Sequence, residues 1–345
     1  INHFMKSKNL FFSVDRLGDY LIRSNVIKKI SEYYDYNEII CSNINFKLIK
    51  NQNFFNKISI FDNNFKFIQK LKYVYHYSFK QYDSVIVFDG KNISNLLLLL
   101  IRAKFKFTFI YKKKKIINKI KFYLLTFIYK FFNIKYVVLN NRDVIESGNL
   151  DNYPQKYMML GKYFNNIENK TYYFKRNNAS FFSKIKNTYI VIHLDEKFND
   201  IIDINRNFNQ ALKSFSKSID RKLIITSYKN NHYYYQKLNI LKKDLPSFKL
   251  SDLNDQKIII IENLSINYFQ DLLENSHCNI SCHSGYFVHT SLGLNKQTID
   301  IMNQKDMPWL QTWINQKNKY KIIFKSNHKY MISIRNILES IKNEI

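Results

Sequence analysis

The chain has 345 residues, which is long enough for two domains that each bury a core of their own. Hydrophobic residues make up 46% of it and aromatic residues 17%, a composition that excludes an intrinsically disordered protein. The formal net charge of +27 is compatible with a nucleic acid, an anionic membrane or an anionic substrate as partner. Lys, Asn, Ile, Phe and Tyr are all abundant, however, and such a bias raises the charge everywhere without creating a binding face.

The cysteines and the short motifs of the sequence limit the kinds of site that the chain can contain. Three cysteines (Cys41, Cys278 and Cys282) are too few for a disulfide framework and indicate a reducing compartment. They form no CxxC pair, and the sequence contains neither a DxD nor an HExxH motif, so no metal site is predicted. No apolar run approaches the roughly 20 residues that a membrane-spanning helix needs, and no apolar signal region is evident.

The first half of the chain alternates apolar runs with helical patterns. Residues 9–14 are typical of a buried strand, and a helix is predicted from about Tyr20 to Tyr34 because its apolar residues recur at helical spacing. Further strands are predicted at 38–41, 58–61, 84–88, 107–111 and 136–139, and helices at about 65–77 and 94–103. This alternation predicts a parallel, doubly wound sheet.

Two candidate site residues follow predicted strands of this half. Asp19 lies in the turn between the first strand and its helix, at the edge where α/β sheets place their functional groups. A carboxylate at this position is also a natural helix N-cap, so both roles remain open. Lys91 lies in the loop after strand 84–88, where it could meet an anionic group or be a solvated loop lysine.

Residues 112–135 form the most unusual segment. Four consecutive lysines precede a helix of aromatic and aliphatic residues that is interrupted by Lys119, Lys121 and Lys130. The segment is too charged to span a bilayer but could lie on an anionic membrane surface. The alternative is a helix that packs its apolar stripe on the sheet and keeps its lysines in water.

The second half repeats the alternation. A helix is predicted at 151–166, and the polar residues 170–187 are typical of an interdomain linker. The new series comprises strand 188–193, helix 208–218, strand 222–226, a further helix, strand 257–261 and helix 266–274. We therefore predict an N-terminal domain at 1–169, a C-terminal domain at 170–329, and a final helix at 330–345 that could pack back on the N-terminal domain.

Residues 275–301 form a strand–turn–helix–strand unit. A strand at 279–282 leads into the turn His283-Ser284-Gly285, a helix runs from about Tyr286 to Leu292 and stops at Gly293, and a strand follows at 297–301. The start of such a helix presents free N–H groups and suits a phosphate. The equally plausible alternative is an ordinary capped helix in which both histidines, His283 and His289, are packing or surface residues.

Two stretches resemble the heptosyltransferase-type glycosyltransferases, the ADP-heptose:lipopolysaccharide heptosyltransferase family or glycosyltransferase family 9. They are VDRLGDYLIRSNVIKKI (14–30), with Gly18 and Asp19, and NLSINYFQDLLENSHCNISCHSGYFVHTSLGLN (263–295). IHLDEK (192–197) is similar to the first C-terminal strand and phosphate-facing loop of this family, and FDGKNISNLLLLLIRAKFKFTF (88–109) to its acceptor side.

The resemblance implies a GT-B fold, in which two Rossmann-like doubly wound domains face a central cleft. It implies an inverting transfer, without metal or cofactor, of a sugar such as heptose from a nucleotide sugar, expected to be an ADP-sugar, to a lipopolysaccharide core or related surface glycan. It also implies a role for each matched residue: Asp19 as general base; donor binding by His193, Lys197, Asn263, Ser265, His283, Ser284, Gly285 and His289; acceptor binding by Arg16, Gly18 and Lys91.

This chemistry also agrees with the residues themselves. Inversion needs a base for the acceptor hydroxyl, which an aspartate can supply, and a cationic environment for the departing diphosphate. A helix N-terminus, Lys197 and a histidine can supply that environment. We expect a cytoplasmic protein, peripheral on the inner membrane and in contact with it through residues 112–135.

The sequence also departs from the family pattern. His283 stands where the family usually has Asp, and His289 follows the glycine by four residues instead of three. Two alternatives therefore remain: a GT-B-like protein that binds a nucleotide sugar or glycan without turnover, and a basic nucleic-acid-binding protein. The second lacks any recognisable RNA- or DNA-binding motif.

Overall fold

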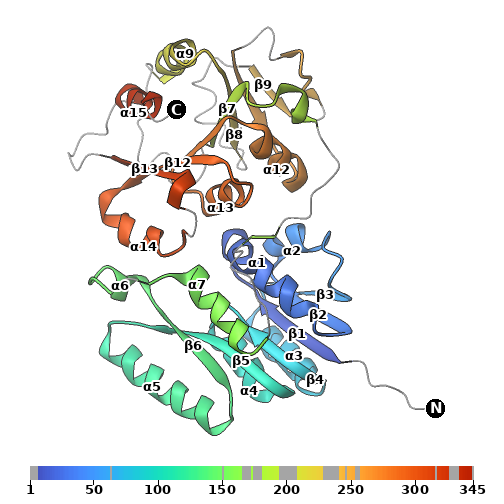
Figure 1. The fold of residues 1–345 in the computed structure, drawn as a ribbon. Coiled ribbons are helices and arrows are strands. Elements are labelled where there is room, and N and C mark those ends of the chain that lie inside the picture. The colour runs from blue at the N-terminus through green and yellow to red at the C-terminus, as the bar shows by residue number, and fades with distance from the viewer. Residues whose placement is uncertain are drawn as a thin grey trace. The chain divides into compact units, whose positions relative to one another are not determined.

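The computed structural model describes residues 7–62, 64–149, 151–164, 172–173, 181–193, 208–227, 241–244, 247–252, 257–314, 317–325 and 334–343. They belong to two compact units (Figure 1). Unit 1 comprises residues 1–175 and 308–315, and unit 2 comprises residues 176–307 and 316–345. The sequence suggested a boundary after residue 169, within a stretch that lies outside the described residues.

Unit 1 is built on a six-stranded parallel sheet in the order β3-β2-β1-β4-β5-β6. Its strands are β1 (Lys8–Ser13), β2 (Tyr36–Cys41), β3 (Lys57–Ile60), β4 (Gln81–Val87), β5 (Arg102–Lys112) and β6 (Lys135–Asn140). The order reverses between β1 and β4, where Phe11 pairs with Ile39 on one side and Ile86 on the other. In open α/β sheets, the carboxyl ends of the strands at such a reversal form the binding crevice.

Helices cover both faces of this sheet: α1 (Leu17–Ser31), α2 (Asn43–Ile49), α3 (Phe67–Ser78), α4 (Asn92–Leu100), α5 (Ile116–Phe131), α6 (Arg142–Ile145), α7 (Tyr153–Met158) and the 3-10 turn η1 (Met159–Lys162). α3, α4 and α5 share one core through Val74, Leu97 and Tyr129. α1 and α7 lie on the opposite face, because Arg23 and Tyr157 both contact the ring of Phe88.

Unit 2 repeats the plan with seven parallel strands in the order β13-β12-β11-β7-β8-β10-β9. They are β7 (Tyr189–His193), β8 (Lys222–Ser227), β9 (Leu241–Asp244), β10 (Ile258–Glu262), β11 (Cys278–Ser281), β12 (Gln297–Asn303) and β13 (Tyr320–Lys325). Strands such as β10, with four consecutive buried isoleucines, are apolar throughout because both faces of the sheet are covered.

The described helices of this half are α9 (Phe208–Ser218), α12 (Ile266–Asn275), α13 (Gly285–Gly293), α14 (Met307–Gln311), α15 (Ile334–Lys342), and the 3-10 turns η2 (Phe182–Ile185), η4 (Gln304–Asp306) and η5 (Lys317–Lys319). α15 buries Leu338 and Ile341 in the core of unit 2 together with Leu212 of α9. The C-terminal segment that belongs to unit 1 is therefore 308–315 and not the final helix. There the Thr312 carbonyl oxygen accepts a hydrogen bond from the Tyr153 N–H at 2.9 Å.

The prediction of an α/β fold with two doubly wound halves is confirmed, and most differences lie at element ends. α1 begins at Leu17 and not near Tyr20, so Asp19 lies inside its first turn. The helix predicted at 151–166 is shorter, because α7 gives way to the 3-10 turn η1 at Met159. Five short elements, α2, α6, β9, α14 and β13, were not predicted. Within the described ranges, none of the helices has both the length and the apolarity to cross a bilayer.

Candidate active site

The carboxyl ends of β1 and β4 in unit 1 carry a cluster of charged side chains. Asp15 lies two residues after the end of β1, and Arg23 lies one and a half turns into α1. The two form an ion pair in which the Arg23 side chain is fully buried. Arg23 also donates to the Phe88 carbonyl oxygen at 3.2 Å and to Ser13 Oγ at 3.1 Å. A buried guanidinium needs such partners, so Arg23 joins the ends of both central strands to α1.

Aromatic rings complete the surroundings of Arg23. Its guanidinium carbon lies 5.0 Å from the centre of the Phe88 ring and 5.6 Å from that of Tyr157. Although burial opposes its charge, the Asp15 carboxylate holds the pKa of Arg23 above its usual value. The guanidinium is therefore a permanent positive charge at this edge of the sheet.

Asp19 lies in the first turn of α1 beside this pair. Its Oδ2 accepts a hydrogen bond from the Arg16 N–H at 3.3 Å, so it caps the helix from within the turn and not from the N-cap position. Burial and the nearby Asp15 carboxylate raise the pKa of Asp19 to about 6, against the opposing effect of Arg23. Asp19 remains partly accessible to solvent. A carboxylate with a pKa near 6 at the carboxyl edge of a parallel sheet has the properties of a general base.

A second carboxylate with a raised pKa follows β4. Asp89 is 5% exposed, and burial together with the charge of Asp15 raises its pKa to about 6. Its Oδ1 accepts a hydrogen bond from the Lys91 N–H at 3.0 Å. The turn requires glycine at position 90, where φ is +61° and an added Cβ would lie 2.5 Å from the Phe109 carbonyl oxygen.

The three predicted acceptor residues lie around these strand ends. Lys91 precedes α4 and donates from Nζ to the Val14 carbonyl oxygen at 3.2 Å, which links the loops after β4 and β1. Arg16 is the exposed N-cap of α1, and Gly18 is buried in the first turn of that helix. Of these three, Arg16 and Lys91 present cationic side chains, while the contribution of Gly18 is to the packing of the turn.

In unit 2 the predicted turn precedes α13 at the carboxyl end of β11. Ser284 is the N-cap of this helix and is buried, but its side chain makes no capping hydrogen bond. Gly285 is the first helical residue, and a Cβ added to it would meet no atom within 4 Å. The protein itself therefore does not require glycine here. A glycine without a steric reason in the fold leaves room for a ligand at the helix N-terminus.

His283 is held in place by a carboxylate from the neighbouring strand. Its backbone adopts a positive φ of 59°, which is uncommon for a residue other than glycine. Asp300 of β12 accepts its N–H at 2.7 Å and lies 3.3 Å from its Nδ1. Asp300 itself is fully buried and accepts a further hydrogen bond from Tyr320 Oη at 2.8 Å. A carboxylate on Nδ1 fixes the ring so that Nε2 is the nitrogen left to carry out recognition.

The other two predicted histidines are buried. Burial and the charge of His283 lower the pKa of His289 to about 3, so its imidazole is neutral at physiological pH. It can serve as a hydrogen-bonding group but not as a cation. His193, at the end of β7, stacks on the Phe287 ring at 5.1 Å, and its Nδ1 lies 3.0 Å from Thr226 Oγ1. It therefore links β7, β8 and α13 behind the turn.

The remaining predicted donor residues precede α12. Asn263 has a positive φ of 53°, and Ser265 is the exposed N-cap of the helix. Both follow β10, so they lie at the same carboxyl edge of the sheet as His283. Lys197 falls outside the described residues.

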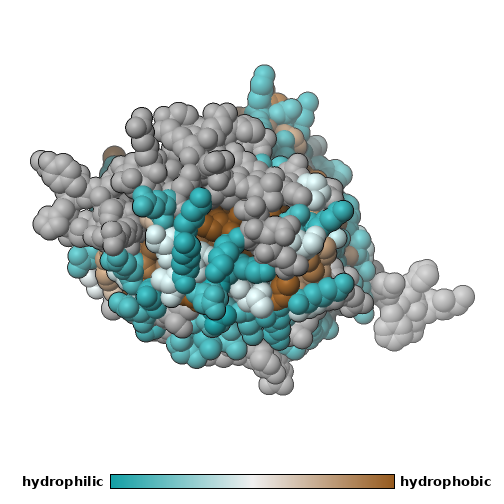
Figure 2. All heavy atoms as spheres, turned by 90° about the horizontal axis from the view of Figure 1, so that it is seen from above, coloured by the Kyte–Doolittle hydropathy of each residue, from teal (hydrophilic) through white to brown (hydrophobic). Residues whose placement is uncertain are grey.

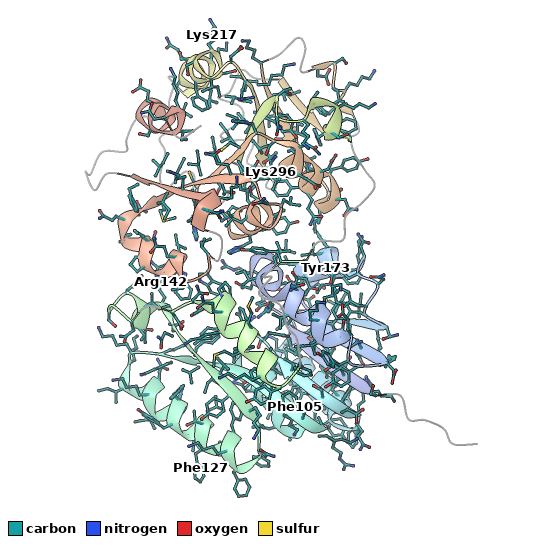
Figure 3. The ribbon with its side chains drawn as sticks, in the orientation of Figure 1. Phe105, Phe127, Arg142, Tyr173, Lys217 and Lys296 are labelled. Atoms are coloured by element: carbon teal, nitrogen blue, oxygen red, sulfur yellow. The ribbon has the colours of Figure 1, made fainter. Side chains whose placement is uncertain are left out.

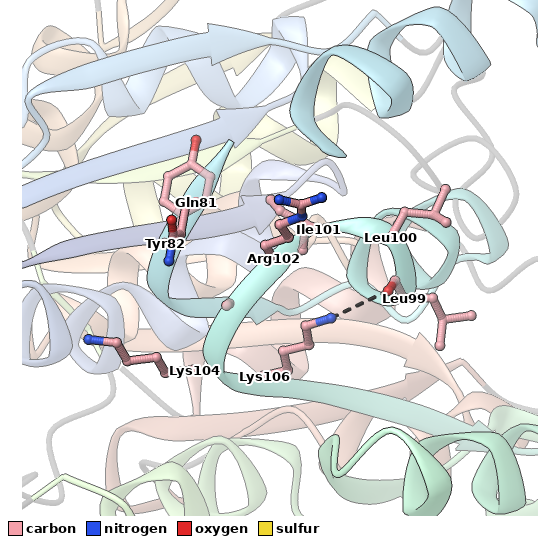
Figure 4. A pocket seen from close by; sticks show the side chains of 9 residues that line it. Gln81, Tyr82, Leu99, Leu100, Ile101, Arg102, Lys104 and Lys106 are labelled. Carbon is pink, nitrogen blue, oxygen red and sulfur yellow. Dashed lines mark hydrogen bonds between the residues drawn. The ribbon is translucent and has the colours of Figure 1, made fainter. Parts of the chain in front are cut away.

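A cavity of about 420 Å³ lies elsewhere, at the amino ends of β4 and β5 (Figure 4). Its lining residues are Gln81, Tyr82, Leu99, Leu100, Ile101, Arg102, Ala103, Lys104 and Lys106. None of the predicted site residues is among them, and Lys106 Nζ donates to the Leu99 carbonyl oxygen at 3.3 Å. This cavity is therefore at the edge opposite to the charged cluster. No three His, Cys, Asp or Glu side chains of the described residues are grouped so that they could hold a metal ion.

Sequence reasoning did not identify Asp15, Arg23, Asp89 and Asp300 as members of the site. Asp15 and Asp89 had a readable signal, because each follows a buried strand by one or two residues. Asp300 had a weaker one, a carboxylate in the middle of an apolar strand pattern, which needs a buried partner. Arg23 had none, since an arginine in a helix is normally a surface residue.

The two Rossmann-like units in one chain define the GT-B class of fold. Solved structures with this fold cover nearly the whole chain. The glycosyl transferase family 9 structure from Veillonella parvula DSM 2008 has a TM-score of 0.67 at 9% identity and covers 98% of each chain. The E. coli heptosyltransferase WaaC with ADP-2-deoxy-2-fluoro heptose has a TM-score of 0.61 at 10% identity and covers 98% of this chain and 100% of its own.

The same fold also occurs in an enzyme of another class. The UDP-GlcNAc 2-epimerase from Methanocaldococcus jannaschii matches with a TM-score of 0.57 at 14% identity, covering 98% of this chain and 92% of its own. No family model matches the sequence, and no curated protein matches it significantly. At these identities the likeness establishes the fold, and the activity must be argued from the site.

Proposed function

We propose that this protein is an inverting glycosyltransferase that moves a sugar from a nucleoside-diphosphate sugar to a lipopolysaccharide core or related surface glycan. The observation that carries the proposal is Asp19, a partly accessible carboxylate whose pKa is raised to about 6 at the carboxyl edge of the first sheet. The fold supports it, because family 9 glycosyl transferase and heptosyltransferase structures share it. We propose heptose as the sugar and ADP as its carrier, since the similar WaaC structure holds an ADP-heptose analogue.

Asp19 is the proposed general base. An acceptor hydroxyl that attacks the anomeric carbon must lose its proton as the new glycosidic bond forms, and an ionised carboxylate can accept it. With a pKa of about 6, Asp19 is mostly ionised near pH 7 and is a stronger base than an ordinary aspartate. Arg16 is the N-cap of the same helix, and Lys91 contacts the loop after β1 through the Val14 carbonyl oxygen, so both can bind polar or anionic groups of the acceptor.

The start of α13 is the proposed site of the donor diphosphate. Its free N–H groups and the open space at Gly285 allow a phosphate to approach the backbone. His283, oriented by Asp300, can donate a hydrogen bond to the departing diphosphate. His289 is neutral, so its role is a hydrogen bond. We propose that these groups and Lys197 stabilise the leaving group without a metal ion.

The proposal is tested with the full chain, ADP-heptose and heptose-deficient lipopolysaccharide core, with product followed by mass spectrometry. Asp19→Asn should abolish transfer, because the amide cannot take the proton, while leaving the melting temperature and ADP binding unchanged. Asp83→Asn is the matched control, since Asp83 is a partly exposed carboxylate near the amino end of β4, at the opposite edge of the same sheet. Its transfer rate should equal that of the native protein.

Several outcomes would contradict the proposal. Transfer by a folded Asp19→Asn protein would remove Asp19 from the mechanism. Donor binding without product, for every acceptor tried, would favour a binding protein. Conversion of a free nucleotide sugar into its epimer would favour the reaction of the epimerase with the same fold. Loss of transfer with EDTA, restored by a divalent cation, would show that the metal-independent mechanism is wrong.

The acceptor also implies a place of action. A lipopolysaccharide core under assembly is anchored in the inner membrane, so we propose that the protein works at the cytoplasmic face of that membrane. The lysine-rich residues 112–135 are the part of the chain that we expect to contact it.

A further inference from the structure

Helix α5 has apolar residues on both of its sides. The inner side packs on the core of unit 1, with Tyr129 buried and Phe122, Leu125 and Ile128 partly buried. The outer side faces solvent, and Figure 3 shows Phe127 pointing away from the sheet. Seven large apolar side chains there are between 59% and 77% exposed: Ile116, Ile117, Ile120, Tyr123, Leu124, Phe127 and Phe131. The helix is therefore not the one-sided amphipathic helix expected of an ordinary sheet cover.

Helix α3 has the same property. Its inner side is fixed by buried Val74 and by Tyr77, whose hydroxyl donates to Glu38 at 2.6 Å. Its outer side exposes Phe67, Ile68, Leu71 and Tyr75, and Phe79 follows at its C-terminus. These residues recur every three or four positions, which places them in one stripe.

Both stripes belong to the same face of unit 1. α3, α4 and α5 share one core on one side of the sheet, so their outer sides face the same way. Leu100, the last residue of α4, is also half-exposed there. We call this surface the α3–α5 face. It holds most of the large apolar side chains that are exposed among the described residues. The surface seen in Figure 2 is by contrast mostly hydrophilic where residues are described.

The segments that build the α3–α5 face carry basic side chains and no acidic ones, and the acidic residues Asp83 and Asp143 lie at their borders beside Lys104 and Lys114. Residues 90–142 contain 11 Lys and 2 Arg but no Asp or Glu, and residues 63–82 contain no acidic residue either. A second copy of the chain docked through this face would bring like charges together, and an anionic surface would not. α5 has 16 residues, too few to span a bilayer but suited to lie in the plane of its surface.

We propose that the α3–α5 face docks on an anionic lipid bilayer. The outer apolar side chains of α5 and α3 enter the boundary between headgroups and acyl chains, and the lysines around them contact the anionic headgroups. The apolar and the charged parts both contribute, so that binding requires more than the lysine cluster at 112–115. This inference extends the proposed function but does not depend on it, because membrane binding is measured without donor or acceptor.

The test is flotation of the full chain with vesicles of phosphatidylcholine containing 30% phosphatidylglycerol, and with vesicles of phosphatidylcholine alone. The test variant is Tyr123→Ser/Leu124→Ser/Phe127→Ser. The matched control is Tyr33→Ser/Ile44→Ser/Phe324→Ser, which removes exposed side chains of nearly the same chemistry outside the α3–α5 face. Circular dichroism and thermal melting verify that both variants fold.

We expect the test variant to bind anionic vesicles about 100-fold more weakly, since half-burial of each such side chain contributes roughly fivefold. The control should bind like the native chain. Vesicles of phosphatidylcholine alone should bind the native chain at least about tenfold more weakly than anionic vesicles do. In Phe127→Trp, anionic vesicles should shift the tryptophan emission to the blue, and lipids brominated near the headgroup should quench it.

Three results would overturn the proposal. The first is a native chain that does not float with anionic vesicles. The second is a test variant that binds as well as its control, which would mean that the apolar stripe does not enter the lipid. The third is a dimer in sedimentation velocity that the test variant alone dissociates, which would assign the face to a second copy of the chain.

Discussion

Asp15 and Arg23 carry opposite charges beside Asp19. Removing Asp15 should therefore shift the pH dependence of activity in one direction, and removing Arg23 should shift it in the other. Asp15 raises the pKa of Asp19 and Arg23 lowers it, while burial is the largest cause of its value of about 6. Asp15→Asn should therefore lower this pKa, and Arg23→Met should raise it. If ionised Asp19 accepts the proton, kcat/KM rises with pH through the pKa of Asp19, and this limb should shift with each substitution.

The expected shift is about one pH unit in each direction. A charge at close range moves a carboxyl pKa by roughly one to three units, and partial solvent access at Asp19 places the effect at the low end. Both variants also break a buried ion pair, which costs about 3–5 kcal/mol. For a domain of this size the melting temperature should fall by roughly 6–20 °C, so assays are performed well below it.

The assay is transfer of heptose at subsaturating donor and acceptor between pH 5 and pH 8, for the native chain and both variants. Because both substitutions destabilise the same ion pair, loss of structure would move both profiles in the same way. Opposite displacements of the acid limb can arise only from charge acting on the titrating group. Unchanged or parallel profiles would refute the assignment of the limb to Asp19.

Three further predictions concern single residues. Gly285→Ala should weaken ADP binding at least about tenfold without lowering the melting temperature, because the added methyl group meets no protein atom but occupies the space of the phosphate; isothermal calorimetry measures this. Gly90→Ala should lower the melting temperature, since a positive φ and a contact of 2.5 Å with the Phe109 carbonyl oxygen both oppose a side chain. Asp89→Asn should stabilise the chain at pH 7 by up to about 3 kcal/mol, measured by urea denaturation. The pKa of Asp89 is raised on folding from 3.8 to about 6, so the native state holds the proton more tightly than the unfolded state does. The stability of the native chain therefore falls as pH rises between these two values, and below pH 4 the native chain and the variant should be equally stable.

The fold was predictable because most central strands are mainly apolar and the helices between them are periodic. Nearly all predicted strands occur within a few residues of their predicted bounds, as with 188–193 against Tyr189–His193. The missed elements have physical reasons. β9 has the sequence LKKD, and β13 contains three lysine or tyrosine residues, so neither shows the uninterrupted apolar run of a central strand.

The candidate site was predictable only at residues whose position directly after a predicted strand indicates a functional role. Asp19 and the turn at His283 to Gly285 have such places. The ion pair of Asp15 with Arg23 and the contact of His283 with Asp300 join residues that are 8 and 17 positions apart in the sequence. Nothing in the local pattern indicates such pairs, because they depend on how two elements pack. The neutral state of His289 was not predictable for the same reason: it follows from burial, not from sequence.

Several destabilising features lie at the carboxyl edges of the two sheets, where α/β sheets bind ligands. In unit 1, Asp19 and Asp89 keep raised pKa values at the carboxyl ends of β1 and β4. In unit 2, His283 keeps a positive φ at the carboxyl end of β11, beside a glycine that the fold does not require. Each feature costs folding free energy that a simple substitution could recover. Their position at these edges agrees with a binding or catalytic role.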